Sequence, residues 1–151
     1  MGPLLQTRFE ALLEHWNAWQ VTDPLHQLEQ CCDASVLLGI GAGDRERKFD
    51  FFLIHTMKVA HGLRILWHLF PEDQRSCILR QCALFVIMIY ICQLRPAFGV
   101  GMIDSIQTVK LDDHCWEAVI DRTLKHRWFK DSHFFKIVRA PKAFEDLWEE
   151  R

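Results

Sequence analysis

Histidine is the residue type in this sequence best suited to proton transfer near neutral pH. Three of the eight histidines fall in one ring-rich stretch, residues 49–70. If this stretch is a helix, His55 shares one stripe with residues that favour the core: Phe52, Thr56, Val59, Leu63, Leu66 and Phe70. His61 and His68, seven residues apart, lie together on the opposite side. We therefore expect one histidine to point with the core and two to point away from it.

Two histidines have settings that favour a neutral imidazole. Burial of His55 on the apolar stripe disfavours the charged ring, so the ring is able to accept a proton. His133 follows Asp131 at a predicted helix N-terminus, whose positive end also disfavours imidazolium. On these grounds alone, a hydrogen-bonded structural role is favoured for each of the two histidines. If both are functional, they suit deprotonation of a phenolic substrate, and we expect them to face one cavity.

Lys136 and Arg139 follow His133 on the same predicted helix. Their charges suit the binding of a ligand's oxyanions, and they equally suit a solvated helix surface.

Metal and cysteine chemistry are less well supported by the sequence. No Glu-x-x-His or His-Glu-x-x-His motif is present, and His61 and His68 would lie about 10 Å apart along a helix. We therefore predict no metal site. Cys115 follows His114 directly, but neighbouring helical side chains point about 100° apart. Cys82 and Cys92 bound an apolar run, where a thiol stays neutral.

Composition and charge exclude two classes of partner. The net charge of −2 comes with no block of basic residues, so we expect neither nucleic acid nor an anionic membrane as a partner. Cys31 and Cys32 are adjacent, and the six cysteines show no paired spacing, which favours free thiols in a reduced, cytoplasmic setting. The richness in Phe and Trp is typical of a thick core, a ligand pocket or a partner surface.

The periodicity predicts helices along most of the chain. We expect them over residues 4–19, 24–38, 49–70 and 72–95, from residue 112 onward, and from Ser132 through Arg139. Pro141 is expected to begin a separate last turn, and residues 96–111 are expected to be irregular. The fold class is therefore all-α, a single compact domain over residues 1–151 with about six helices around a buried central hairpin.

Two segments within this pattern need separate interpretation. Gly39-Ile40-Gly41-Ala42-Gly43 has the wrong last spacing for a dinucleotide-binding loop and follows a predicted helix, so chance or a helix C-cap is favoured. Residues 82–92 form eleven positions without a charge, about 16 Å as a helix, where a bilayer core needs about 20 residues. We predict a fully buried core helix and no membrane span.

Two motifs resemble those of a known family. Arg45-Glu-Arg-Lys-Phe-Asp-Phe-Phe-Leu-Ile-His55 resembles the K-x-D-F-F-L-M-H signature of questin oxidase-like proteins. Trp116-Glu-Ala-Val-Ile-Asp-Arg122, with Asp131-Ser-His-Phe-Phe-Lys-Ile-Val-Arg-Ala140, resembles that family's C-terminal pattern. The order and spacing agree over roughly residues 25–140.

The resemblance implies a mostly helical enzyme of fungal secondary metabolism. Members are associated with Baeyer–Villiger-type monooxygenase chemistry that opens an anthraquinone ring of an aromatic polyketide, with NADPH as reductant and dioxygen as oxidant. By position, the resemblance implies His55 and His133 as catalytic residues. The matching substrate-binding residues are Asp50, Trp116, Arg122, Lys136 and Arg139.

The chain departs from the family in length. Members are usually about three times as long, with a histidine-rich N-terminal half that has no counterpart here. The first hypothesis is an oxidoreductase acting on an aromatic polyketide. The alternative is a catalytically incomplete helical module that binds an aromatic ligand or a partner, either as a homodimer or with a chain that supplies the other half.

Overall fold

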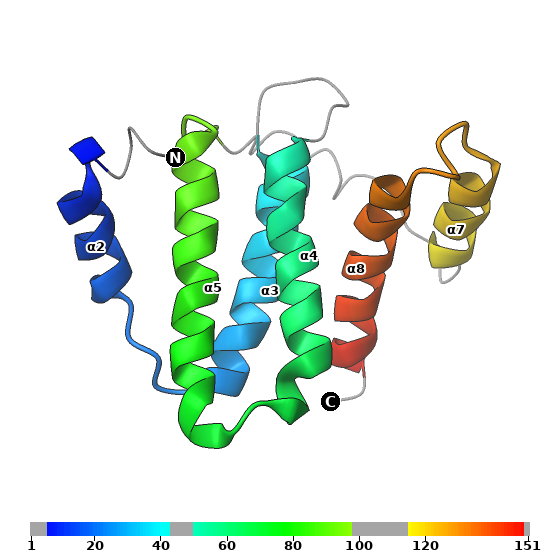
Figure 1. The fold of residues 1–151 in the computed structure, drawn as a ribbon. Coiled ribbons are helices and arrows are strands. Elements are labelled where there is room, and N and C mark those ends of the chain that lie inside the picture. The colour runs from blue at the N-terminus through cyan, green and yellow to red at the C-terminus, as the bar shows by residue number, and fades with distance from the viewer. Residues whose placement is uncertain (1–5, 43–49, 98–114, 150–151) are drawn as a thin grey trace. The chain divides into compact units, whose positions relative to one another are not determined.

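The computed structural model describes residues 6–42, 50–97 and 115–149, and their regular structure is helical (Figure 1). The helices are α2 (Phe9–Ala18), α3 (Pro24–Gly41), α4 (Phe51–Leu66), the short 3-10 helix η1 (Trp67–Leu69), α5 (Glu72–Cys92), α7 (Cys115–Lys125) and α8 (Ser132–Glu149). The predicted all-α class is confirmed. The residues predicted to be irregular, 96–111, lie largely outside the described ranges.

Two compact units divide the chain, Met1–Phe98 and Gly99–Arg151. The first contains α2 to α5 and the second contains α7 and α8. The number of independently folding domains stays a prediction.

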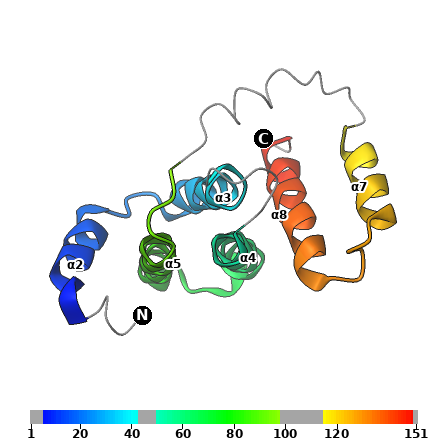
Figure 2. The ribbon, with the colours of Figure 1, turned by 90° about the horizontal axis from the view of Figure 1, so that it is seen from above.

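The first unit is built on three neighbouring helices, α3, α4 and α5 (Figure 2). Their shared core contains Leu38 of α3, Leu53 of α4 and Ile89 of α5. Helix α2 packs beside α5, where the Trp16 indole Nε1 donates a hydrogen bond to the Arg80 carbonyl oxygen over 2.7 Å. The Arg80 guanidinium in turn lies 4.5 Å from the centre of the Trp16 ring.

The glycine-rich segment is helical and serves helix packing. Gly39 and Gly41 belong to the last turns of α3 and are buried. A Cβ at position 39 would lie 2.8 Å from Met57 Cε of α4, so the missing side chain allows the two helices to approach closely. The predicted helix end near Leu38 was therefore too early, and close packing rather than chance or a C-cap accounts for Gly39.

The buried face of α4 differs from the predicted stripe. Phe52, Val59 and Leu66 are 51%, 38% and 46% exposed, whereas Leu53, Met57 and Ala60 are buried. Thr56 and Leu63 belong to both faces. The true core face is therefore turned by about one residue, or 100°. The prediction failed because apolar residues occur all around this helix, so periodicity could not fix its rotation.

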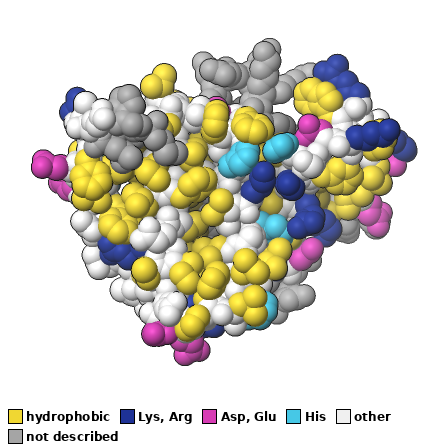
Figure 3. Space-filling view, in the orientation of Figure 1, with side chains coloured by type: hydrophobic (Ala, Val, Ile, Leu, Met, Phe, Trp, Pro, Cys, Tyr) yellow, Lys and Arg dark blue, Asp and Glu magenta, His cyan; other side chains and the backbone are white. Residues whose placement is uncertain are grey.

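Helix α5 is not fully buried. Its buried side chains are Leu79, Cys82 and Ile89, and Figure 3 shows hydrophobic side chains spread over the face of the molecule where α5 lies. Within the described residues, α5 is the one helix long and apolar enough to cross a membrane, and 17% of its most apolar window is buried. Core helices of water-soluble proteins meet the same criterion, so this feature alone does not identify a membrane span.

The second unit is a pair of helices, α7 and α8. The helical spacing of Val119, Ile120 and Leu124 predicts an inward apolar face for α7, but these side chains are 39%, 39% and 53% exposed. A unit of two described helices offers too little opposing surface to cover that face.

Helix α8 runs through Pro141 instead of ending before it. Proline removes one backbone donor from the helix. Ala140 and Phe144, on either side of it, are each 2% exposed, so their packing holds the helix continuous.

Candidate functional site

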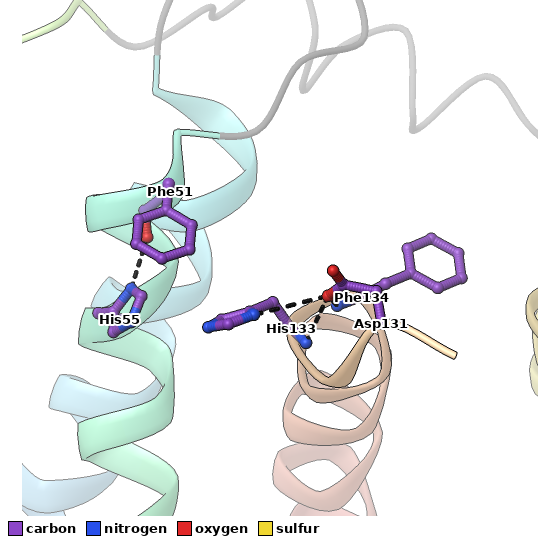
Figure 4. Close-up of polar contacts among 5 residues, drawn as sticks. All are labelled: Phe51, His55, Asp131, His133 and Phe134. Atoms are coloured by element: carbon purple, nitrogen blue, oxygen red, sulfur yellow. Dashed lines mark hydrogen bonds and ion pairs between the residues drawn. The ribbon is translucent and has the colours of Figure 1, made fainter. Parts of the chain in front are cut away.

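His55 lies near the start of α4, and its ring nitrogen is oriented by a backbone carbonyl. Its Nδ1 lies 2.6 Å from the Phe51 carbonyl oxygen, and its ring centre lies 4.6 Å from that of Phe51 (Figure 4). A carbonyl oxygen only accepts, so Nδ1 is the protonated nitrogen and Nε2 is the nitrogen with a lone pair in the neutral ring. The His55 side chain is half-buried, so the prediction that it points into the core is only partly correct.

Asp50 caps the helix that carries His55. One carboxylate oxygen, Oδ1, accepts hydrogen bonds from the backbone N–H groups of Phe52 (2.8 Å) and Leu53 (3.0 Å). An aspartate in this position satisfies donors that the first helical turn leaves unpaired. The contacts of Asp50 therefore assign it a part in positioning α4.

The start of α8 repeats this arrangement around His133. Asp131 Oδ1 accepts from the backbone N–H groups of His133 (2.7 Å) and Phe134 (3.1 Å), and it lies 3.5 Å from His133 Nδ1 (Figure 4). The backbone N–H groups of Phe134 and His133 lower the pKa of Asp131, with the charge of a protonated His133 adding to the effect. Asp131 therefore stays ionised and favours a proton on His133 Nδ1, which leaves the lone pair on Nε2 in the neutral ring.

Trp116 joins α7 to α8. Its indole Nε1 donates a hydrogen bond to Glu145, and the Lys142 ammonium lies 5.7 Å from the centre of its ring. These contacts hold the two helices of the second unit together.

An apolar groove of about 270 Å³ lies between α7 and α8. Ile120, Leu124, Phe135 and Val138 supply most of its walls, and they are joined by Thr123, Arg139, Lys142, Ala143 and Asp146. Lys142 Nζ lies 2.7 Å from Asp146 Oδ1, so its charge at this rim is balanced. The walls suit a flat apolar ring, and the Arg139 guanidinium adds a bidentate donor for oxyanions.

The seven predicted site residues therefore divide among several places. His55 and Asp50 lie at the start of α4, in the first unit, and the other five lie in the second. Arg139 lines the groove between α7 and α8, whereas Arg122 and Lys136 are exposed helix residues outside its lining. Whether His55 and His133 share a cavity stays a prediction.

The groove itself was missed at the level of sequence. Its walls come from both helices, and they include Ile120 and Leu124 of α7, whose spacing predicts a buried face. Both helices have a strong amphipathic pattern, and the apolar stripe on each is wider than a single partner helix can cover. This width was the sequence signal that could have predicted an exposed apolar groove.

Three thiols of the first unit, those of Cys31, Cys32 and Cys82, are held protonated by burial. Burial raises the pKa of Cys31 and of Cys32 to about 12, and it also raises the pKa of Cys82. The predicted neutral setting agrees with the burial of Cys82, whereas Cys92, at the other end of the apolar run, is exposed. Within the described ranges, no group of His, Cys, Asp and Glu side chains has a metal-binding arrangement.

The described part of the glycine-rich segment is not suited to binding a dinucleotide. A phosphate-binding loop presents free backbone N–H groups at the start of a helix. Gly39 and Gly41 instead lie in the closing turns of α3, and Gly39 packs against Met57.

Comparison with known protein families identifies a match over most of the chain. The sequence model of a family described as questin oxidase-like matches residues 2–141. No curated protein and no solved structure matches the chain.

Proposed function

Because the chain belongs to the questin oxidase-like family, we propose that it opens a ring of an anthraquinone or a related aromatic polyketide by Baeyer–Villiger-type oxidation. Membership supports an oxidoreductase-type function and a polyketide context in general. The observation that carries the proposal is the extent of the match, residues 2–141, which includes all seven candidate residues.

The proposed role of His55 is that of a general base. Its Nδ1 donates to the Phe51 carbonyl, so the Nε2 lone pair is the one able to take a phenolic proton. Removal of that proton enriches the ring in electrons and prepares it for oxidation. In His133, as in His55, an oxygen lies beside Nδ1, here from Asp131, so the lone pair is on Nε2. We propose that His133 orients the substrate or moves a second proton.

The groove between α7 and α8 is the proposed position for an aromatic ring. Its apolar walls would remove ring surface from water, and Arg139 would bind a phenolate or carboxylate oxygen of the same molecule.

NADPH and dioxygen remain proposals from the family resemblance. The described residues offer no phosphate-binding loop in the glycine-rich segment, so we assign no step to a nicotinamide held by them. The residues of this chain are assigned proton transfer and substrate binding only.

The test is turnover of an anthraquinone by the purified chain with NADPH and air. We expect NADPH consumption and a ring-opened product, both reduced by a factor of about 10² to 10⁴ in a His55→Asn variant, because a positioned base contributes about this much. The Asn amide can still donate to the Phe51 carbonyl, so the variant removes the base and retains the hydrogen bond. His68→Asn is the matched control, since His68 is an exposed residue of η1.

One observation favours a second candidate, a module that binds an aromatic ligand without turning it over. The second unit contains a ring-sized groove with a cation at its rim. Saturable binding of an anthraquinone carboxylate that Arg139→Gln weakens, with no product under any condition, would favour this candidate and contradict the first.

A further inference from the structure

A second groove, in the first unit, lies between α2 and α5 and encloses about 1000 Å³. Its apolar lining is aliphatic: Ala11 and Leu12 from α2, and Ile87, Ile91 and Leu94 from α5 and the turn after it. The described lining residues include two rings, those of Tyr90 and His15, and neither Phe nor Trp. An aliphatic trough of this kind suits a flexible alkyl chain better than a flat ring system.

The cations of this groove gather at one end. Arg8 immediately precedes α2, and Arg95 follows the end of α5. The two helices run in opposite directions, because the C-terminal part of α2 contacts the N-terminal half of α5 through Trp16 and Arg80 (Figure 1). Arg8 and Arg95 therefore belong to the same end of the helix pair, and both are exposed.

No acidic residue in the described lining balances the positive charge of the two arginines. The described residues that line the groove include two arginines and His15, and none of them is an aspartate or a glutamate. This contrasts with the groove between α7 and α8, where Asp146 accompanies Lys142. The α2–α5 groove is thus complementary to an anion.

The backbone at the cationic end is held in a costly conformation. Leu94 and Arg95 have φ values of 62° and 52°, in the left-handed region that residues other than glycine rarely adopt. Hydrogen bonds from Leu94 N to Ile91 O (3.0 Å) and from Arg95 N to Tyr90 O (3.0 Å) hold the turn, and the Tyr90 hydroxyl donates to Pro96 O over 3.3 Å. Leu94 is 88% exposed at the rim, so burial of its own side chain does not account for the strain.

We propose that the groove between α2 and α5 binds a medium-chain aliphatic carboxylate, with the alkyl chain in the trough and the carboxylate between Arg8 and Arg95. The distance along α2 from Arg8 to His15 is seven residues, about 10 Å, which matches an alkyl chain of about eight to ten carbons. This binding is independent of the proposed ring oxidation.

Calorimetric titration of the full chain with decanoate, decanol and decylammonium separates the contributions of chain and charge. We expect decanoate to bind most tightly, decanol more weakly and decylammonium most weakly. Replacing both arginines, as Arg8→Gln with Arg95→Gln, should lower the affinity for decanoate by about tenfold, to near the affinity for decanol. The expected change is small because each exposed ion pair contributes little binding free energy. Arg127→Gln, in the second unit, is the matched control and should change nothing.

A second pair of variants tests the trough. Ala11→Trp fills it from an exposed helix position and should abolish decanoate binding, whereas Ala18→Trp, at the other end of α2 and outside the lining, should not. The proposal is overturned if decylammonium binds as tightly as decanoate, if the double arginine variant retains full affinity, or if Ala11→Trp leaves binding intact.

Discussion

At the scale of single residues, a hydrogen bond at His55 and an ion-pair contact at His133 decide which histidine nitrogen carries the lone pair. His55 and His133 each have Nδ1 directed to an oxygen, from the Phe51 carbonyl and from the Asp131 carboxylate respectively. In both rings the Nε2 lone pair is therefore the proton acceptor. The predicted cap of α8 at Asp131 is confirmed, whereas the sequence did not reveal that Asp50 caps α4 and so places His55.

A prediction at this scale concerns the thiols of the first unit. At about pH 8, Cys32 should react with iodoacetamide at least a hundred times more slowly than the exposed Cys92, because its pKa of about 12 leaves very little thiolate. Mass spectrometry of the native protein after brief labelling measures both rates. Equal labelling of the two residues would contradict the assigned burial.

The same thiols make stability depend on pH. Unfolded cysteines titrate near the ordinary value of 9.0, whereas folded Cys31 and Cys32 keep their protons until about 12. The unfolded chain therefore binds fewer protons in this window, and the free energy of unfolding falls as pH rises from 9 to 12. Urea unfolding at about pH 8 and pH 10 should show the loss, and it should shrink in a Cys31→Ala, Cys32→Ala variant.

At the scale of elements, glycines report how closely helices pack. A Cβ added at Gly62 of α4 would meet no atom within 4 Å, so Gly62→Ala should raise the free energy of unfolding by about 1 kcal/mol through helix propensity alone. Gly39→Ala gains the same propensity but must displace Met57 Cε, so little net change is expected. Gly39→Leu should destabilise by roughly 2 kcal/mol or more. Urea midpoints for the three variants measure these differences, and a neutral Gly39→Leu would contradict the close α3–α4 contact.

The turn after α5 allows a second test at this scale. Leu94→Gly removes a side chain from a residue with φ of 62°, and should stabilise the chain by about 1 kcal/mol. Gln93→Gly is the matched control, because φ is −85° there and glycine relieves nothing. Thermal unfolding compares the two variants. If Leu94→Gly is no more stable than Gln93→Gly, the turn is not strained.

Element positions were more predictable from the sequence than the directions of side chains. Asp23 and Pro24 marked the start of α3, and the Asp23 carboxylate accepts from His26 N as a cap should. The rotation of α4 and the exposure of α5 were not predictable, because both helices are apolar on nearly every side. Which apolar face is buried depends on contacts with other helices, and a single helix pattern does not contain that information.

At the scale of the whole molecule, the chain combines a unit that carries His55 with a unit that carries His133 and the α7–α8 groove. The family resemblance was readable from the sequence because it depends on short motifs, and the match over residues 2–141 confirms it. A shared site was not derivable, since it depends on how the two units meet, and short motifs carry no information on that.

The most direct test of the central claim is incorporation of labelled dioxygen. The purified chain, an anthraquinone and NADPH are incubated under isotopically labelled oxygen gas, and the product is analysed by mass spectrometry. We predict a ring-opened product that carries one labelled oxygen atom, at a yield that falls sharply in His55→Asn and not in His68→Asn. A product without the label, or a labelled product that His55→Asn forms as fast as the unaltered chain, would contradict the account.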